Sequence, residues 1–213
     1  IGVVSSIVGL RGSVFKVTGQ QNHAGTTMMD IRKDASAALY ALANSINEEF
    51  PKVAGDRSVW TMGRVSIHPG APSIVPGTAE LELQYRDAST DILDAFARTE
   101  QRLVRKINER GGARVENISS RDPIHPSLMH PDFVRQLELA AEGHVPGKWL
   151  TMPSGAYHDA GVLQEVMPSG MLFIPSIKGI SHDFAENSHE EDIVLGCQVL
   201  ADAAASLMIS GLS

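Results

Sequence analysis

The sequence predicts a mixed α/β fold whose first part is a ferredoxin-like α+β unit, and three observations support this prediction. Apolar residues recur at helical spacing over 34–50 and again over 91–110. Thr78–Tyr85 alternates apolar with polar residues, as a strand with one buried and one solvated face does. Three further extended segments complete the order β-α-β-β-α-β: 13–18, 58–68 and 113–119. For this order we expect a four-stranded sheet with both helices on one face.

Local signals justify the boundaries of these elements. Ser89 and Thr90 are suited to cap the second helix, and Gly111-Gly112 stops it. Two Pro-Gly pairs, at 69–70 and 76–77, mark turns between strands. The apolar stripes expected to face the sheet are Ala38, Leu39, Leu42, Ile46 and Phe50 in the first helix, and Ile92, Phe96, Leu103 and Ile107 in the second.

The composition shifts after residue 121, where a linker-like segment precedes a second region. The elements expected there are a helix over 131–142, a loop of small and polar residues over 153–160, a buried strand over 171–175, a loop that carries His182, and a helix over 190–208. Helices and strands alternate as in an α/β layer, but the strands are too few for a self-sufficient doubly wound sheet. Because the chain opens on an apolar β-like run without an initiator methionine, we expect half a domain whose other half would precede Ile1.

Composition excludes several classes of partner. The chain has 213 residues, 43% of them hydrophobic, which is enough for a substantial core. A net charge of −7 gives no basic footprint for nucleic acid or an anionic membrane. We find no uninterrupted apolar run of the roughly 18 to 20 residues that a membrane span needs, and no basic start of a signal peptide. The single cysteine, Cys197, fits a reducing compartment, so a cytoplasmic location is expected.

Three of the eight histidines occupy informative positions. His23 lies among small residues where a strand leads to a helix, which suits an anion or equally a capping loop served by Asn22 or Thr26. His158 lies among small residues that suit a pocket wall or a plain turn. His182 follows an apolar strand and has two carboxylates nearby, so it is either a metal ligand or a solvated loop histidine.

Three blocks of the sequence resemble the hydantoinase/carbamoylase family of amidases, within the dinuclear-zinc peptidase superfamily. The blocks are His23-Ala24-Gly25-Thr26-Thr27 with Met29, Arg32, Asp34 and Ala35; Ser154-Gly155-Ala156 with His158-Asp159-Ala160; and Met171 to Glu186 with Gly179-Ile180-Ser181-His182. The resemblance implies the end of a catalytic segment over 1–9, a ferredoxin-like lid and dimerisation domain over 10–120, and the C-terminal part of a zinc-peptidase-like catalytic domain over 121–213. Dimerisation through the lid is implied as well.

The resemblance also assigns roles to residues. His182 matches a metal ligand, and His23 matches a lid histidine that stabilises an oxyanion in the partner subunit's site. Arg86 matches an arginine that binds the substrate carboxylate, although a surface ion pair with Asp87 is the ordinary interpretation of such a residue. Substrate contacts are implied for Ser73, Ser154, Gly155, His158 and Gly179.

The implied cofactor is a pair of divalent metal ions per subunit, for which zinc, manganese, cobalt and nickel are all suitable. The family's other metal ligands and its general-base glutamate would lie upstream of Ile1, so we expect this chain to hold no metal stably and to be inactive alone. Two departures from the family pattern limit what the resemblance implies, and the second concerns a substrate contact. Met28-Met29 stands where the family commonly has Pro-Met, and Ser73 stands where it often has asparagine.

These observations predict a parent enzyme that hydrolyses non-peptide C–N bonds of carbamoyl or ureido compounds bearing a carboxylate. Metal would lower the pKa of bound water, and an upstream glutamate would carry the proton. Two alternatives stay open: an aminoacylase or peptidase of the same superfamily, and a non-catalytic module that dimerises through an open edge strand of the lid.

Overall fold

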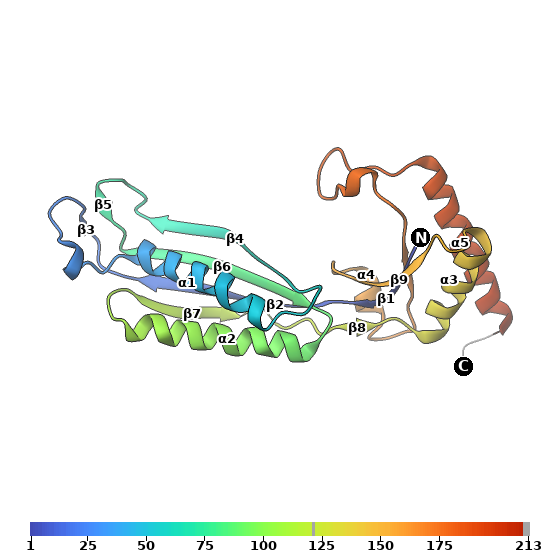
Figure 1. Cartoon of the computed structure of the whole chain (residues 1–213), viewed down its shortest axis with the longest axis horizontal. Coiled ribbons are helices and arrows are strands. Elements are labelled where there is room, and N and C mark those ends of the chain that lie inside the picture. The colour runs from blue at the N-terminus through green and yellow to red at the C-terminus, as the bar shows by residue number, and fades with distance from the viewer. Residues whose placement is uncertain (121, 211–213) are drawn as a thin grey trace. The chain divides into compact units, whose positions relative to one another are not determined.

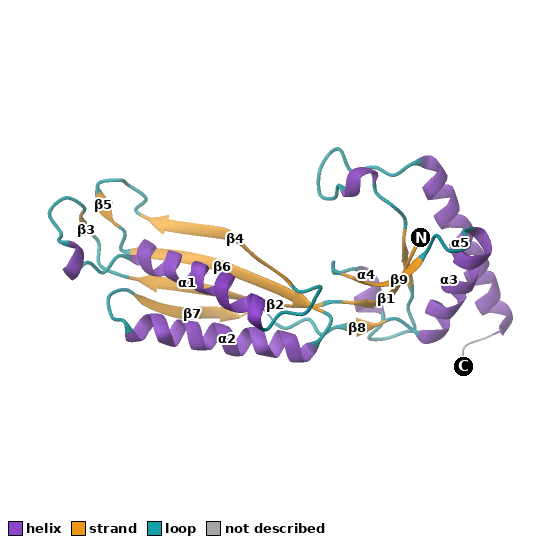
Figure 2. Cartoon of the chain, in the orientation of Figure 1, coloured by secondary structure: helices purple, strands orange, loops and turns teal. Residues whose placement is uncertain are grey.

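The computed structural model describes residues 1–120 and 122–210, and the chain divides into two compact units (Figure 1). One unit combines Ile1–Val8 with Pro126–Ser213, and we call it the layer unit. The other is continuous, Gly9–His125, and we call it the sheet unit. The mixed α/β class predicted from the sequence is confirmed (Figure 2).

The sheet unit is built on four long antiparallel strands. They lie in the order β4-β6-β2-β7 and have the bounds β2 Gly9–Thr18, β4 Val59–His68, β6 Thr78–Asp87 and β7 Arg114–Ser120. Helix α1, Ala35–Glu49, follows β2, and helix α2, Thr90–Glu109, follows β6, so the order along the chain is β-α-β-β-α-β. The strands β4 and β7 form the two edges of this sheet.

Local chemistry fixes where the two helices begin and end. The side chain of Asp34 accepts hydrogen bonds from the backbone N–H of Ser36 and Ala37, and Ser89 accepts one from Ile92. These are N-caps that satisfy otherwise unpaired helix amides. At the end of α2, Gly111 and Gly112 have φ of 75° and 90°, which glycine adopts without a steric penalty.

Both helices bury their apolar stripes against the same face of the sheet. The predicted alternation in β6 is confirmed, since Leu81 and Leu83 are buried while Glu80 is exposed. The core includes a cluster of aromatic rings in which Phe50 and Phe96 lie 4.5 Å apart between ring centroids. The buried members of this core are Phe15, Val17, Ala35, Leu39, Leu42, Ile46, Phe50, Ala79, Leu81, Leu83, Tyr85, Leu93, Phe96, Leu103, Ile107, Ala113 and Val115.

The sheet unit also carries a two-stranded ribbon outside the main sheet. Strand β3, Asn22–His23, pairs antiparallel with β5, Ile74–Val75. A short 3-10 turn, η1 (Met29–Ile31), separates β3 from α1, and another, η2 (Phe50–Lys52), follows α1. Strand β3 thus lies on the connection between β2 and α1, where the sequence predicts either an anion-binding loop or a capping loop.

In the layer unit, a small sheet forms around β1, Gly2–Ile7. This strand pairs parallel with β9 (Leu150–Ser154) and antiparallel with β10 (Met171–Phe173) and β8 (Ser127–Leu128). Helices α3, Pro131–His144, and α5, Glu190–Ser210, pack together with β1. A short helix α4, Asp159–Leu163, and a 3-10 turn η3, Ile177–Gly179, complete the unit.

Two predictions in this unit are wrong in detail. The segment 153–160 is not a continuous loop, because Pro153 and Ser154 end β9 and Asp159 begins α4. The strand expected over 171–175 ends at Phe173 and is half-buried rather than buried. A short apolar run predicts a strand but does not reveal whether both faces of the sheet are covered.

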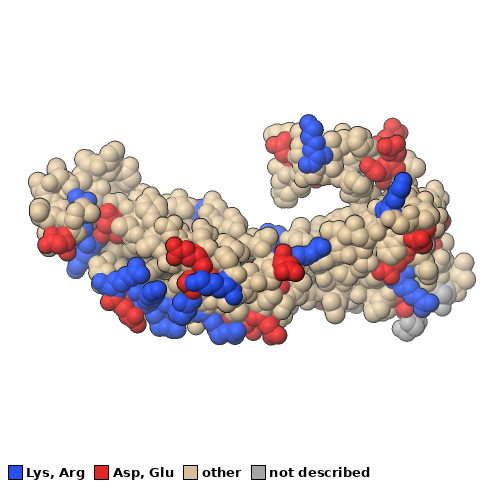
Figure 3. All heavy atoms as spheres, viewed as in Figure 1, with Lys and Arg blue, Asp and Glu red and all other residues tan. Residues whose placement is uncertain are grey.

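The surface carries mixed charge. On the face of the molecule that Figure 3 shows, acidic and basic side chains are interspersed. Among the described residues, the α5 segment Glu190–Ile209 is long and apolar enough to cross a membrane by length and composition alone, which is weak evidence for a span. Its Cys197 is exposed and free.

Candidate functional site

His23 and Ser73 are brought together by the β3–β5 ribbon. The backbone N–H of Ala24 donates to the carbonyl of Ser73 over 2.9 Å, and His23 lies opposite Ile74 in the register. Both His23 and Ser73 are exposed. Fifty residues apart in sequence, the two thus form one polar surface at the ribbon.

The tautomer of His23 follows from its hydrogen bonds. The backbone N–H of Gly25 donates to Nδ1 of His23 over 3.0 Å. Because Nδ1 accepts, the proton of the neutral ring must lie on Nε2. Nε2 is therefore the atom that donates, so the exposed ring presents an N–H group to whatever approaches it.

The loop that holds His23 is braced by two polar side chains. Thr27 donates through Oγ1 to the carbonyl of His23 over 2.7 Å. Arg32 donates through Nε to the carbonyl of Thr27 over 3.0 Å, and through Nη2 to the carbonyl of Ala24. These bonds fix the backbone from His23 to Thr27, and the bond from the N–H of Gly25 to Nδ1 orients the ring before any ligand binds. The alternative in which Asn22 or Thr26 caps the following helix is wrong, because Asp34 caps α1; Asn22 Oδ1 instead accepts from the N–H of His23 over 2.8 Å.

Arg86 lies near the C-terminal end of β6, on the solvated face of the sheet. Its guanidinium donates to Oε1 of Gln84 from Nε over 3.3 Å and from Nη2 over 2.9 Å. Asp87 is buried on the opposite face, where its carboxylate accepts from Ser58 over 2.5 Å and from the N–H of Ser89 over 2.7 Å. Consecutive strand residues point to opposite faces, so the side chains of Arg86 and Asp87 do not form a surface ion pair with each other.

The two candidate groups of the sheet unit lie at opposite ends of β6. The strand starts at Thr78, next to the ribbon, and reaches Arg86 eight residues later. At about 3.3 Å per residue, the separation along the strand is roughly 26 Å. Figure 1 shows the ribbon at one end of the long sheet. Within one chain, a small substrate cannot touch both His23 and Arg86.

In the layer unit, Ser154 and His158 form a hydrogen-bonded pair. The distance between Ser154 Oγ and His158 Nε2 is 2.8 Å, and Ser154 is 1% exposed. Ser154 Oγ also donates to the carbonyl of Ala156 over 3.0 Å, and the N–H of Ala156 returns a bond of 3.1 Å. The ring of His158 packs against Phe173 at 5.5 Å between centroids. These contacts orient the imidazole of His158. Gly155, which lies between Ser154 and His158 in the sequence, is exposed.

His182 does not form a metal site with its neighbours in the described part of the chain. It is exposed and has φ of 58°, and its backbone N–H donates to Oε2 of Glu186 over 2.8 Å. Across residues 1–120 and 122–210, no group of three or more His, Cys, Asp or Glu side chains is placed to hold a metal ion. One imidazole does not satisfy the three or more protein ligands that a zinc site requires. Gly179 lies in the same loop, exposed and with φ of 69°.

Two supporting residues were not predicted as site residues from the sequence. Arg32 braces the His23 loop, and Gln84 holds the guanidinium of Arg86. The signal for Gln84 is its position two residues before Arg86 in an alternating strand, which places both on one face. Arg32 belongs to the sequence block around His23, but the block does not reveal its bracing role, because its hydrogen bonds reach backbone carbonyls of an irregular loop.

The fold and these motifs define the class of protein. The profile of peptidase family M20/M25/M40 matches residues 18–206, and the chain belongs to this family. A crystal structure of a hydantoinase/carbamoylase family amidase from Burkholderia phymatum is 43% identical, with a TM-score of 0.88 over 97% of this chain and 49% of that one.

Curated relatives agree with that structure. An N-carbamoyl-L-amino acid amidohydrolase from Geobacillus stearothermophilus is 32% identical over 94% of this chain and 48% of its own length. An allantoate amidohydrolase from Escherichia coli K12 is 32% identical with the same coverage. The resemblance drawn from the sequence blocks is confirmed. The chain spans about half the length of the curated relatives it matches.

Proposed function

We propose that this chain is part of an amidohydrolase that cleaves a non-peptide C–N bond in a carbamoyl or ureido compound bearing a carboxylate. The names of its relatives support the bond type, since carbamoyl amino acids and allantoate share a ureido group and a carboxylate. The observation that carries the proposal is the pre-positioned Nε2–H donor of His23, held on a braced ribbon.

In this proposal His23 stabilises negative charge on the oxygen of the carbamoyl group. Attack on the carbonyl carbon converts that oxygen to an oxyanion, and a fixed N–H donor lowers the energy of the transition state most when no reorganisation is needed. The bond from Gly25 to Nδ1 keeps the proton on Nε2. Removing one donor of this kind costs a factor of about 10² to 10³ in kcat.

Arg86 binds the substrate carboxylate in the same proposal. A guanidinium engages a carboxylate through two parallel hydrogen bonds, which lysine cannot reproduce. Gln84 accepts from Nε and Nη2 and so sets the plane of this group. The binding energy would act on the ground state and the transition state alike, so its loss should raise KM more than it lowers kcat.

We propose further that His23 and Arg86 act in one site only across two copies of the chain. Their separation along β6 of roughly 26 Å exceeds the length of a carbamoyl amino acid. An edge strand offers a route to association, because β4 presents unpaired backbone groups and the exposed side chains of Val59 and Val65. The sheet unit would then serve as a lid and as the dimerisation surface of a homodimer.

Metal dependence is also part of the proposal. His182 would supply one ligand to a divalent ion, and the remaining ligands would come from outside the described residues, which contain no such cluster. We therefore propose that the 213-residue chain by itself retains no metal and has negligible turnover. The proposed location is the cytoplasm, consistent with a single free cysteine.

The test compares variants of the full-length protein that contains this chain. With N-carbamoyl amino acids and allantoate as substrates, His23→Ala should lower kcat by about 10² or more, whereas His68→Ala, another exposed histidine of the sheet unit, should not. Arg86→Lys should raise KM, and Arg64→Lys on the same sheet is the matched control.

Three results would contradict the proposal. The first is a full-length protein that binds metal yet cleaves none of these compounds. The second is a preference for N-acetyl amino acids or dipeptides, which would assign an aminoacylase or peptidase function instead. A protein that dimerises but hydrolyses nothing would identify a non-catalytic association module.

A further inference from the structure

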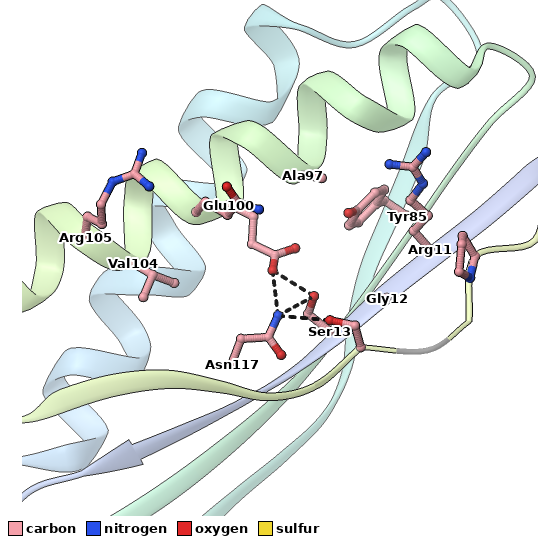
Figure 4. A pocket seen from close by; sticks show the side chains of 12 residues that line it. Arg11, Gly12, Ser13, Tyr85, Ala97, Glu100, Val104, Arg105 and Asn117 are labelled. Carbon is pink, nitrogen blue, oxygen red and sulfur yellow. Dashed lines mark hydrogen bonds between the residues drawn. The ribbon is translucent and has the colours of Figure 1, made fainter.

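A cavity of about 440 Å³ lies within the sheet unit between α2 and the strands β2 and β7 (Figure 4). It is separate from the His23 ribbon, and its volume lies in the range of about 300 to 1,000 Å³ that is typical of small-molecule sites. Its lining includes hydrocarbon from Ala97 and Val104 on α2 and the ring of Tyr85 on β6.

The most unusual group in this lining is Glu100, a carboxyl that is only 5% exposed. Its Oε1 accepts from Ser13 Oγ over 2.7 Å and from Asn117 Nδ2 over 3.1 Å. Its Oε2 is buried and has no hydrogen-bond partner among residues 1–120 and 122–210. Figure 4 shows the carboxyl directed from α2 toward Ser13 and Asn117, beside the cavity. Burying a carboxylate without a cationic partner costs free energy, and a hydrogen-bond donor at this oxygen would offset that cost.

Within residues 1–120 and 122–210, no cationic side chain forms an ion pair with Glu100. Arg11 on β2 also lines the cavity, but its Nη1 lies 2.6 Å from Oδ1 of Asp94, which already balances its charge. Arg105 lines the cavity from α2 and is exposed, and Tyr85 lines it from β6. Burial raises the pKa of Glu100, as expected for a carboxyl with only neutral donors beside it.

We propose that this cavity binds a small organic amine, with its ammonium group against the carboxylate of Glu100 and its alkyl part against Val104 and Ala97. A metal ion is a poor fit, because Glu100 is the single carboxylate among the described lining residues and hard cations require several oxygen ligands. An ammonium needs only one charge partner, to which it donates charge-assisted hydrogen bonds. The terminal torsion of glutamate is soft, so Oε2 can turn toward an occupant without displacing α2.

The inference does not depend on the hydrolase function and is tested on the 213-residue chain by titration calorimetry with n-propylamine hydrochloride. At pH 8 we expect saturable binding with a dissociation constant of about 1 mM or tighter, which suits a ligand of so few atoms. Propionate, which has similar size and the opposite charge, should not bind. Binding should weaken at pH 5, where protonation of Glu100 competes with the amine.

Two variants separate a ligand site from a structural carboxyl. Glu100→Gln keeps the shape of the side chain and should weaken amine binding at least tenfold, while Glu109→Gln, an exposed glutamate at the end of α2, should leave it unchanged. Ala97→Phe should abolish binding by filling the cavity while Glu100 stays intact. The proposal is overturned if the parent chain shows no saturable binding up to about 10 mM amine, if Glu100→Gln binds as well as the parent, or if propionate binds equally.

Discussion

The sheet unit and the layer unit bury their apolar residues in different ways. In the sheet unit, one continuous core joins two helices to a four-stranded sheet, and Phe15, Phe50 and Phe96 are fully buried. The layer unit has two smaller clusters, centred on Val3 with α3 and α5, and on Val4 with Ile7 and Met129. It also leaves Val166, Phe184 and Met208 exposed.

The sheet unit is stabilised by its own core, whereas the layer unit depends on whatever covers its exposed apolar residues. A single large core resists local opening, whereas small clusters beside exposed apolar surface do not bury enough area to do so alone. The sheet unit should therefore fold as an independent cooperative domain. The layer unit should be less stable in isolation and more sensitive to whatever covers its apolar residues.

The largest expected effect is in the core of the sheet unit. Phe96→Ala removes a fully buried ring that contacts Phe50, Tyr85 and Trp60, and should lower the free energy of unfolding by about 3–5 kcal/mol. Urea denaturation measures the change. The matched control is Phe184→Ala, whose side chain is fully exposed and whose loss should stay within about 0.5 kcal/mol.

A smaller effect is expected in the core of the layer unit. Leu137→Ala on α3 should cost about 2 kcal/mol, the low end for a buried leucine, because its small cluster can relax into the space. Hydrogen exchange should show the loss of protection confined to α3, α5 and β1. A loss of protection that spreads through β2 and β6 would mean that the two units unfold together, which would contradict the independent folding expected of the sheet unit.

Capping of α1 tests the sheet unit with a more local change. Asp34→Ala removes the acceptor for the N–H groups of Ser36 and Ala37 and should cost about 1 kcal/mol. Thermal unfolding monitored by circular dichroism gives the shift. Replacement of Asp34 by Asn should recover most of the lost stability, and a failure to do so would show that the charge rather than the cap matters.

The smallest effect concerns the pH dependence of the sheet unit. Because burial raises the pKa of Glu100 above its ordinary value of 4.5, the folded chain binds this proton more tightly than the unfolded chain. The associated stability is present below pH 4.5 and is lost as pH rises through the raised pKa. Glu100→Gln does not titrate, so its stability relative to the parent should increase as the pH rises from below 4.5 through the raised pKa. Glu109→Gln should show no such trend.

Much of the sheet unit could be predicted from the sequence because its signals are local. The alternation in β6, the stripe of α2 and the cap at Ser89 each lie within one element. Strand β9 was missed because its support comes from parallel pairing with β1, nearly 150 residues away. Such pairing leaves no periodic mark in a five-residue segment that ends in Pro153-Ser154.

Part of the candidate site could likewise be predicted from the sequence, and part of it could not. His23, Arg86 and His182 could be singled out from motifs, but the hydrogen bond that sets the tautomer of His23 depends on the fold of its loop. The cavity beside Glu100 had no sequence signal, since a glutamate on an amphipathic helix is ordinarily exposed. Its burial follows from packing against Ser13 and Asn117 on two different strands.

We propose that His23 of one copy and Arg86 of another complete one site. Complementation between two inactive variants of the full-length protein tests this most directly. His23→Ala and Arg86→Ala would be purified, mixed, dissociated and reassociated, and turnover of a carbamoyl amino acid measured. Random assortment should restore about a quarter of the parent activity, because half of the dimers are mixed and each of these holds one intact site. If the mixture stays as inactive as the separate variants, both residues belong to the same chain's site or to none, and the claim is wrong.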